Sequence, residues 1–171
     1  MFACIHGQSL PVTPSLADFA YAFSPLVEET STDTVVIDTE GCELLFGSAY
    51  ELANEIVHCA QKGPRAGGLG CKVNVALAGN PEAAIQAARF FEGITYIAPG
   101  EELSALGDLP IEALCPELSP KSKDQSPKED RKRAEEIQGI FATLRMWGVR
   151  TFRDFAALPT TGVAVRLGQE G

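Results

Sequence analysis

The chain of 171 residues has no long run of apolar residues and no basic N-terminal leader. Its apolar stretches are interrupted within about ten residues, whereas a membrane-spanning helix needs about twenty. The N-terminal run Phe2–Ile5 is short and lacks the positively charged start of a secretory signal. The sequence therefore predicts a cytoplasmic protein with no membrane-spanning segment.

Closely spaced cysteines are also missing. The five cysteines are odd in number, never form a C-x-x-C pair and lie far apart, at Cys4, Cys42, Cys59, Cys71 and Cys115. Zinc sites and disulfide frameworks use short, regular spacings. We therefore expect free thiols in a reducing compartment and no structural zinc site.

Basic residues are scarce in the first two thirds of the chain. Residues 1–117 carry four Lys or Arg and sixteen Asp or Glu, a net charge of −12. Residues 118–171 carry ten basic and seven acidic side chains, a net charge of +3. Because an acidic surface repels phosphate, we expect any contact with nucleic acid to fall in the C-terminal third.

What the chain does have is an alternation of strand and helix patterns. Apolar and β-branched runs predict strands over residues 2–6, 26–30, 34–38, 71–78 and 93–98. Between them lie helices over 15–23, 48–61 and 80–90, with Ser48 and Glu51 forming a capping box and Asn80 preceding Pro81. This order predicts an α+β fold with an antiparallel or mixed sheet and helices on one face.

The composition changes at Pro116. No apolar residue follows Leu118 until Ala134, so we expect a linker over residues 116–130. A helical pattern then runs from about Lys128 to Trp147. The chain is therefore divided into a domain at 1–115, the linker and a helical segment at 131–171. We also expect it to be part of a longer protein.

Two segments carry a family resemblance. Residues 23–47, with Phe23-Ser24-Pro25, Asp33, Asp38 and Gly41, resemble the palm of the Y-family (DinB/UmuC-like, translesion) DNA polymerases. Residues 144–159 resemble the helix-hairpin-helix that starts the thumb of that family, and 73–78 and 94–102 match its later palm strands in the same order. The resemblance implies a palm-like, ferredoxin-like sheet followed by a small helical thumb-like region.

The chain departs from the pattern of active members at the metal site. They hold two Mg²⁺ ions with an Asp on the first strand and adjacent Asp and Glu at the palm turn. Here the first strand has no carboxylate, Asp33 stands at the turn and Thr34 replaces the Glu. Since one carboxylate cannot hold two divalent ions, we expect Asp33 to be vestigial, with no catalytic residue, metal or cofactor. These departures are closest to the non-catalytic ImuB-like branch.

His6, Asp33 and Asp38 also have structural explanations that involve no metal. His6 could be a substitute ligand, but imidazole suits Mg²⁺ poorly, so we favour a strand-end histidine without a metal. Asp33 is favoured as a corner residue that bonds nearby backbone amides, and Asp38 as a turn former.

Nucleotide-binding features of the family are also missing. Only residues 8–22 lie where it has a fingers subdomain. The run Gly67–Gly70 lacks the Lys-Ser/Thr of a phosphate loop.

The helix-hairpin-helix supplies the DNA-binding candidates. Thr151 is predicted to cap a helix with Asp154 in the capping position, leaving amides exposed for one backbone phosphate. The candidate residues are Gly148, Arg150, Thr151, Arg153 and Arg145. A plain helical hairpin packed by Trp147, Phe152 and Phe155 explains the same pattern, and both readings stay open.

The resemblance implies an accessory scaffold in DNA damage tolerance, serving translesion synthesis and induced (SOS) mutagenesis in the bacterial cytoplasm and at the nucleoid. The implied partners are an error-prone replicative polymerase subunit and the sliding clamp, with weak, sequence-independent DNA contact. One alternative is a weak polymerase that uses Mg²⁺ or Mn²⁺. Another is an unrelated α+β domain that binds a small ligand.

Overall fold

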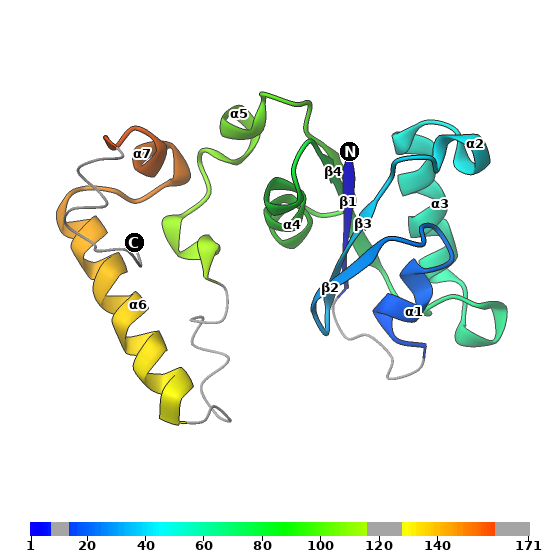
Figure 1. Ribbon diagram of the computed structural model, residues 1–171, viewed down its shortest axis with the longest axis horizontal. Coiled ribbons are helices and arrows are strands. Elements are labelled where there is room, and N and C mark those ends of the chain that lie inside the picture. Colours follow the sequence, from blue (N-terminus) through cyan, green and yellow to red (C-terminus); the bar gives the residue numbers. More distant parts are fainter. Residues whose placement is uncertain (8–13, 116–127, 160–171) are drawn as a thin grey trace. The chain divides into compact units, whose positions relative to one another are not determined.

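The computed structural model describes residues 1–7, 14–115 and 128–159, and of residues 128–134 it describes the backbone alone. The chain divides into two compact units, Met1–Glu102 and Leu103–Gly171. Figure 1 shows a sheet with helices in the first unit and a long helix in the second. None of the described helices is long and apolar enough to cross a membrane.

The first unit is built on a five-stranded sheet. Its strands are β1 (Phe2–Gly7), β2 (Val27–Ser31), β3 (Thr34–Asp38), β4 (Val73–Ala78) and β5 (Ile94–Tyr96). They lie in the order β2-β3-β1-β4-β5. β1 is antiparallel to both neighbours and β2 is antiparallel to β3, whereas β4 and β5 are parallel. The predicted α+β class with a mixed sheet is therefore confirmed.

Helices cover both faces of this sheet. Helices α1 (Leu16–Ala20) and α3 (Ala49–Gln61) share one hydrophobic cluster with Ala3 and Ile5 of β1. Figure 1 shows α4 (Pro81–Phe90) on the opposite side of the sheet from α1 and α3. Cys4 and His6 alternate with Ala3 and Ile5 along β1 and so belong to the α4 side, where Arg89 of α4 influences both. The first four strands with α1 and α3 have the ferredoxin-like order, and α4 and β5 extend it. The prediction had placed the helices on one face of the sheet. In the structure α4 covers the second face as well, and β1 is therefore buried on both sides.

Local capping sets where the longer helices of this unit begin. Ser48 and Glu51 form the predicted capping box, with Ser48 Oγ accepting a hydrogen bond from the Glu51 amide. The Asn80 side chain accepts from the Ala83 amide at 2.8 Å, and Pro81 occupies the first helical position. Both helices start at the predicted residues because each start is decided by neighbours in the sequence.

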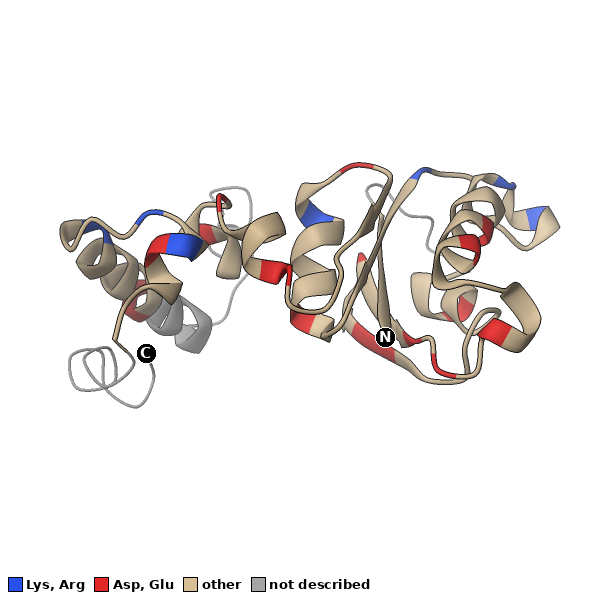
Figure 2. Cartoon of the chain, turned by 90° about the horizontal axis from the view of Figure 1, so that it is seen from above, with Lys and Arg blue, Asp and Glu red and all other residues tan. Residues whose placement is uncertain are grey.

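Charge is unevenly divided between the units. Residues 1–102 carry four Lys or Arg against thirteen Asp or Glu, a net charge of −9. In Figure 2 acidic residues accordingly outnumber basic ones around the sheet. Residues 103–171 carry ten of each sign and are neutral overall.

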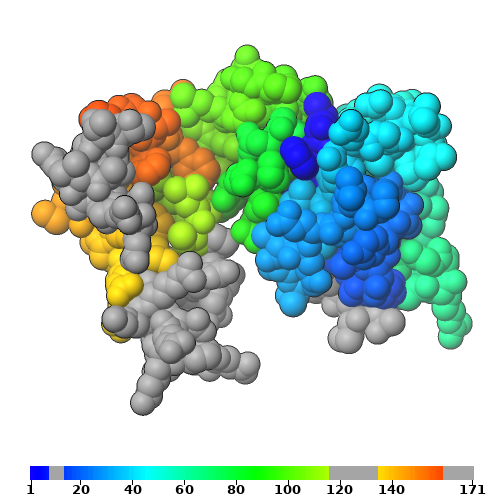
Figure 3. All heavy atoms as spheres, viewed as in Figure 1, coloured from blue at the N-terminus to red at the C-terminus, as the bar shows by residue number. Residues whose placement is uncertain are grey.

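A single helical turn, α2 (Glu43–Phe46), was not predicted. It follows Gly41, whose φ of 82° is favourable only for a residue without a side chain, and precedes Gly47 at φ 79°. The α2–α3 segment, cyan in Figure 3, lies at the surface of the sheet unit.

The second unit is helical. Its elements are α5 (Glu102–Leu106), a 3-10 turn at Ile111–Leu114, α6 (Lys128–Met146) and α7 (Phe152–Ala156). Ile111, Phe141, Leu144 and Val149 form its buried cluster. The backbone ties the 3-10 turn to the hairpin, because the Ile111 amide donates to the Arg150 carbonyl at 2.9 Å.

The predicted domain limits differ from this grouping. The sequence assigned residues 103–115 to the palm-like domain, whereas here they belong to the second unit, in which buried Ile111 packs with Phe141 and Leu144. Of the predicted linker, 116–127 lie outside the described residues and 128–130 belong to α6. Of the segment 131–171, the last twelve residues also lie outside them.

Candidate functional site

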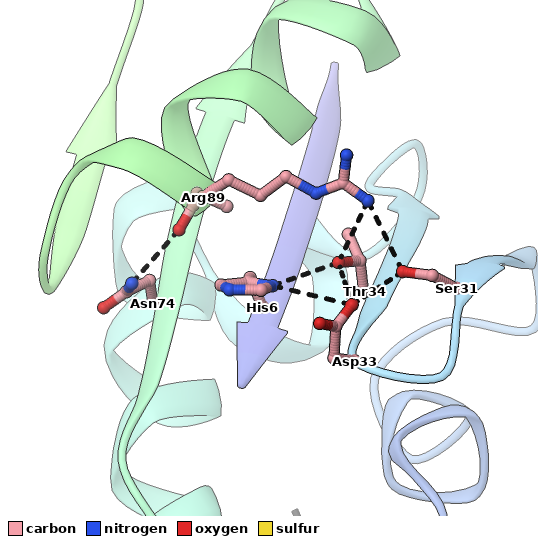
Figure 4. A network of polar contacts seen from close by, with 7 residues as sticks. His6, Ser31, Asp33, Thr34, Asn74 and Arg89 are labelled. Atoms are coloured by element: carbon pink, nitrogen blue, oxygen red, sulfur yellow. Dashed lines mark hydrogen bonds and ion pairs between the residues drawn. The ribbon is translucent and has the colours of Figure 1, made fainter. Parts of the chain in front are cut away.

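The candidate metal site of the family falls at one corner of the sheet, where β1 ends beside the β2–β3 hairpin (Figure 4). In the β1–β3 ladder His6 lies opposite Thr34, and Asp33 precedes Thr34 in the hairpin. The His6 Nδ1 atom is 3.0 Å from Thr34 Oγ1 and 3.9 Å from Asp33 Oδ1. The structure therefore brings His6 and Asp33, which the sequence singled out separately, into one site.

Asp33 accepts two hydroxyl hydrogen bonds. Ser31 Oγ donates to Asp33 Oδ1 at 2.6 Å and Thr34 Oγ1 donates at 2.8 Å. Partial burial acts to raise the pKa of Asp33. The two hydroxyl bonds, with the nearby His6 and Arg89, outweigh it and hold the pKa below its usual value. Asp33 was expected to bond backbone amides at this corner, but in the structure its partners are the hydroxyls of Ser31 and Thr34.

The proton positions follow from this arrangement. Thr34 has one hydroxyl proton, and it goes to the Asp33 carboxylate. Thr34 Oγ1 must then accept from His6, so we assign the proton of the neutral imidazole to Nδ1. Burial lowers the pKa of His6, which Asp33 partly opposes, and the His6 side chain is only 11% exposed. His6 is therefore a neutral donor at neutral pH.

Arg89 completes the site, and sequence reasoning missed it. It projects from the last turn of α4, and its Nη2 atom lies 3.4 Å from Ser31 Oγ and 3.5 Å from Thr34 Oγ1. The two hydroxyls thus accept from Arg89 and donate to Asp33 (Figure 4). The only sequence signal was that no other Lys or Arg occurs between Lys72 and Lys121. We call His6, Ser31, Asp33, Thr34 and Arg89 the corner.

The corner does not fit Mg²⁺. It offers one carboxylate, already bonded to two hydroxyls, and a guanidinium that repels a cation. Across the described parts of the chain, no three His, Cys, Asp or Glu side chains are grouped to hold a metal. The corner therefore lacks the set of carboxylates that two-metal chemistry needs.

The neighbouring thiol is unreactive. Cys4 is buried on β1, and this burial raises its pKa to about 12 against the opposing charge of Arg89. The five cysteines, all within the described parts of the chain, form no disulfide with one another. A protonated, buried thiol is neither a nucleophile nor a metal ligand at neutral pH.

The second unit holds the predicted DNA-binding residues on one hairpin. Gly148 turns the chain at φ 84°, and Thr151 caps α7 in the predicted capping box. However, the amides of Arg150 and Thr151 donate to Asp154 Oδ2 at 3.0 Å. The Arg153 amide donates to the Gly107 carbonyl. These amides lie at an exposed position but already have acceptors, because the Asp154 carboxylate and the carbonyls of Gly107 and Leu109 accept from this helix start.

Two of the three candidate arginines make ion pairs within the same unit. Arg145 Nη2 lies 2.6 Å from Glu112 Oε1, and Arg153 Nη2 lies 3.2 Å from Asp108 Oδ1. All four side chains are at least partly solvated, so each pair is weak and can exchange for a phosphate. DNA contact through this hairpin stays a prediction.

Comparison with known proteins supports the resemblance. No protein-family profile matches the chain. The chain is similar to DNA polymerase IV 2 of Mesorhizobium japonicum. The two are 32% identical over 91 residues, which is 52% of this chain and 21% of that polymerase. The chain thus matches about a fifth of its relative's length, and the similarity supports a Y-family-like relationship.

Proposed function

We propose that the chain is a non-catalytic, Y-family-like accessory protein of the ImuB-like branch, acting in translesion synthesis and induced mutagenesis. Three things support this: the palm-like sheet, the similarity to a DNA polymerase IV, and a corner unsuited to two-metal chemistry. The corner carries the proposal. Its single carboxylate is bonded to two hydroxyls beside a guanidinium, and such a site is unsuited to holding the two ions that nucleotidyl transfer requires.

The chemistry of the corner argues against nucleotidyl transfer. That reaction needs two divalent ions a few ångströms apart to bridge the attacking and leaving oxygens. In their place Arg89 supplies one fixed positive charge, which the Ser31 and Thr34 hydroxyls connect to Asp33. A guanidinium donates hydrogen bonds but cannot activate a bound hydroxyl as a metal ion does.

The region before β2 also supports a non-catalytic function. Fifteen residues, 8–22, separate β1 from the Phe23 segment, and α1 accounts for Leu16–Ala20. One short helix leaves no basic subdomain to grip a triphosphate. Binding partners are therefore proposed to supply the activity: an error-prone replicative polymerase subunit and the sliding clamp. DNA contact is proposed to be weak and to use the Arg150 hairpin.

A weak, Mn²⁺-dependent polymerase is the second candidate, and the named relative is the observation that favours it. The unrelated small-ligand-binding domain is disfavoured by the same match. Primer extension separates the first two candidates. The protein is incubated with primed template and nucleotides in Mg²⁺ or in Mn²⁺, beside an Asp33→Ala variant, with the Mesorhizobium polymerase as the active standard.

We expect no extension above the Asp33→Ala background in either metal. Extension by the native chain that Asp33→Ala abolishes would overturn the non-catalytic proposal, since it would require ligands that complete the site around Asp33. Extension that persists equally in Asp33→Ala would be traced to a contaminating polymerase.

A further inference from the structure

Two adjacent leucines project into solvent from α2. Leu44 is 93% exposed and Leu45 is 82% exposed, and Tyr50 in the first turn of the following helix α3 is 56% exposed. Single exposed apolar residues are ordinary on protein surfaces, but a group of large ones on one short segment marks an interaction site. This segment is the cyan surface at one end of the sheet unit in Figure 3.

The leucines are held outward by well-packed neighbours. Cys42 is buried, and its Sγ donates to the Phe23 carbonyl at 3.4 Å. Phe46 packs against the main core, with its ring centroid 5.7 Å from that of Phe23. The turn is therefore anchored on both sides of Leu44 and Leu45, and their exposure is a fixed property of the fold.

The surroundings of these side chains are acidic. Glu40, Glu43 and Glu51 are exposed on the same segment, and Glu51 is fixed by accepting from the Ser48 amide and hydroxyl. Residues 1–61 contain nine Asp or Glu and no Lys or Arg. An apolar centre inside a rim of one sign selects partners of the opposite sign.

We propose that the surface around α2 docks a partner protein through an amphipathic helix whose apolar face is flanked by Lys or Arg. This α2 surface consists of Leu44, Leu45 and Tyr50 with Glu40, Glu43 and Glu51. The proposal rests on the proposed accessory function and names the chemistry of one partner. A second copy that docked through its own α2 surface would bring the same acidic rim against itself, and nucleic acid or anionic lipid would be repelled. A basic amphipathic helix can cover the leucines with its apolar face and form ion pairs with the surrounding carboxylates.

The test uses the whole chain, labelled with ¹⁵N, and two synthetic probes. One peptide places Leu at helical i, i+3, i+4 and i+7 positions with Lys elsewhere, and the other scrambles the same residues. Amide chemical shifts locate binding, and fluorescence anisotropy measures the dissociation constant. The variants are Leu44→Ser with Leu45→Ser, and Glu40→Lys with Glu43→Lys. The matched control is Met146→Ser, an apolar residue 86% exposed beside Arg145 in the other unit.

We expect the amphipathic peptide to shift the amides of residues 40–51. Its affinity is expected to fall about tenfold in each double variant and to stay unchanged in Met146→Ser. Equal binding of the scrambled peptide at those amides, or an unchanged affinity in the leucine variant, would overturn the proposal. The proposal would also be overturned if light scattering showed that the native chain is a dimer and that the leucine variant is a monomer, because the surface would then bind a second copy. Peptide binding and primer extension are independent measurements. If the docking proposal fails, primer extension still tests the proposed non-catalytic function.

Discussion

At the scale of single residues, the corner is a network in which each hydroxyl has two charged neighbours. Ser31 and Thr34 stand between the Arg89 guanidinium and the Asp33 carboxylate, and His6 donates to Thr34. A hydroxyl is able to accept and donate at once, so the network satisfies both charges without a bound ion.

Arg89→Met is expected to destabilise the fold by about 1 kcal/mol, the usual contribution of one polar contact, because the hydroxyls lose their donor while the aliphatic packing is kept. Urea denaturation at neutral pH measures the change. Arg65→Met, on an exposed turn of the same unit, serves as the control and is expected to change stability by less than about 0.5 kcal/mol. Equal effects of the two variants would show that Arg89 does not support the corner.

His6 is expected to make stability depend on pH. Its pKa is lowered in the folded state, chiefly by burial, so below the usual value of 6.5 the unfolded chain takes up a proton that the folded chain resists. Stability should therefore fall as the pH drops from 7 to 5. Asp33, with its lowered pKa, contributes stability that is lost only below about 3.8, in a separate window.

The measurement is the urea midpoint at a series of pH values. His6→Gln should flatten the loss between pH 7 and 5. His58→Gln, at an exposed position of α3, should leave it as in the native chain. A native curve that is already flat in this range would mean that His6 stays accessible to protons when folded.

At the scale of elements, what depended on neighbours in sequence was predictable. β3 has the predicted bounds, and α3 starts after Ser48 and ends at Gln61 as expected, because β-branched runs and capping boxes are local signals. The turn α2 was missed, since Cys42 and Phe46 are fixed by distant residues such as Phe23. For the same reason the sequence pointed to Asp33 and His6 but not to Arg89, which lies on α4, far from both in sequence.

The α7 hairpin allows a prediction about DNA. Asp154 occupies the Arg150 and Thr151 amides, and these hydrogen bonds hold the pKa of Asp154 below its usual value. Asp154→Ala frees both amides, so duplex DNA at low salt should bind about two- to fivefold more tightly. The same change should lower the urea midpoint, because it removes a helix cap.

Fluorescence anisotropy with a labelled duplex provides the measurement. Glu135→Ala, an exposed position on α6, removes the same charge without freeing an amide. If Glu135→Ala tightens binding as much as Asp154→Ala does, net charge explains the gain. If neither variant changes affinity, the hairpin serves packing and the DNA prediction is wrong.

At the scale of the whole molecule, the chain combines an acidic sheet unit with a neutral helical unit. The sequence showed this asymmetry and placed the boundary at residue 115, whereas the compact units divide after Glu102. Charge and composition change near Pro116, yet Ile111 is buried with Phe141 and Leu144, and only the folded chain brings those residues together. The division by charge agrees with the division of proposed tasks: protein docking on the acidic unit and weak DNA contact on the other.

The guanidinium at the corner also determines how the site would respond to an added acid. A single acidic substitution at His6 or Thr34 would place a carboxylate beside Arg89 and gain an ion pair. Each such change alone would therefore strengthen the closed network before it could attract a metal ion. Under the proposed non-catalytic function, a chain with this arginine would need several substitutions together to acquire a two-metal site.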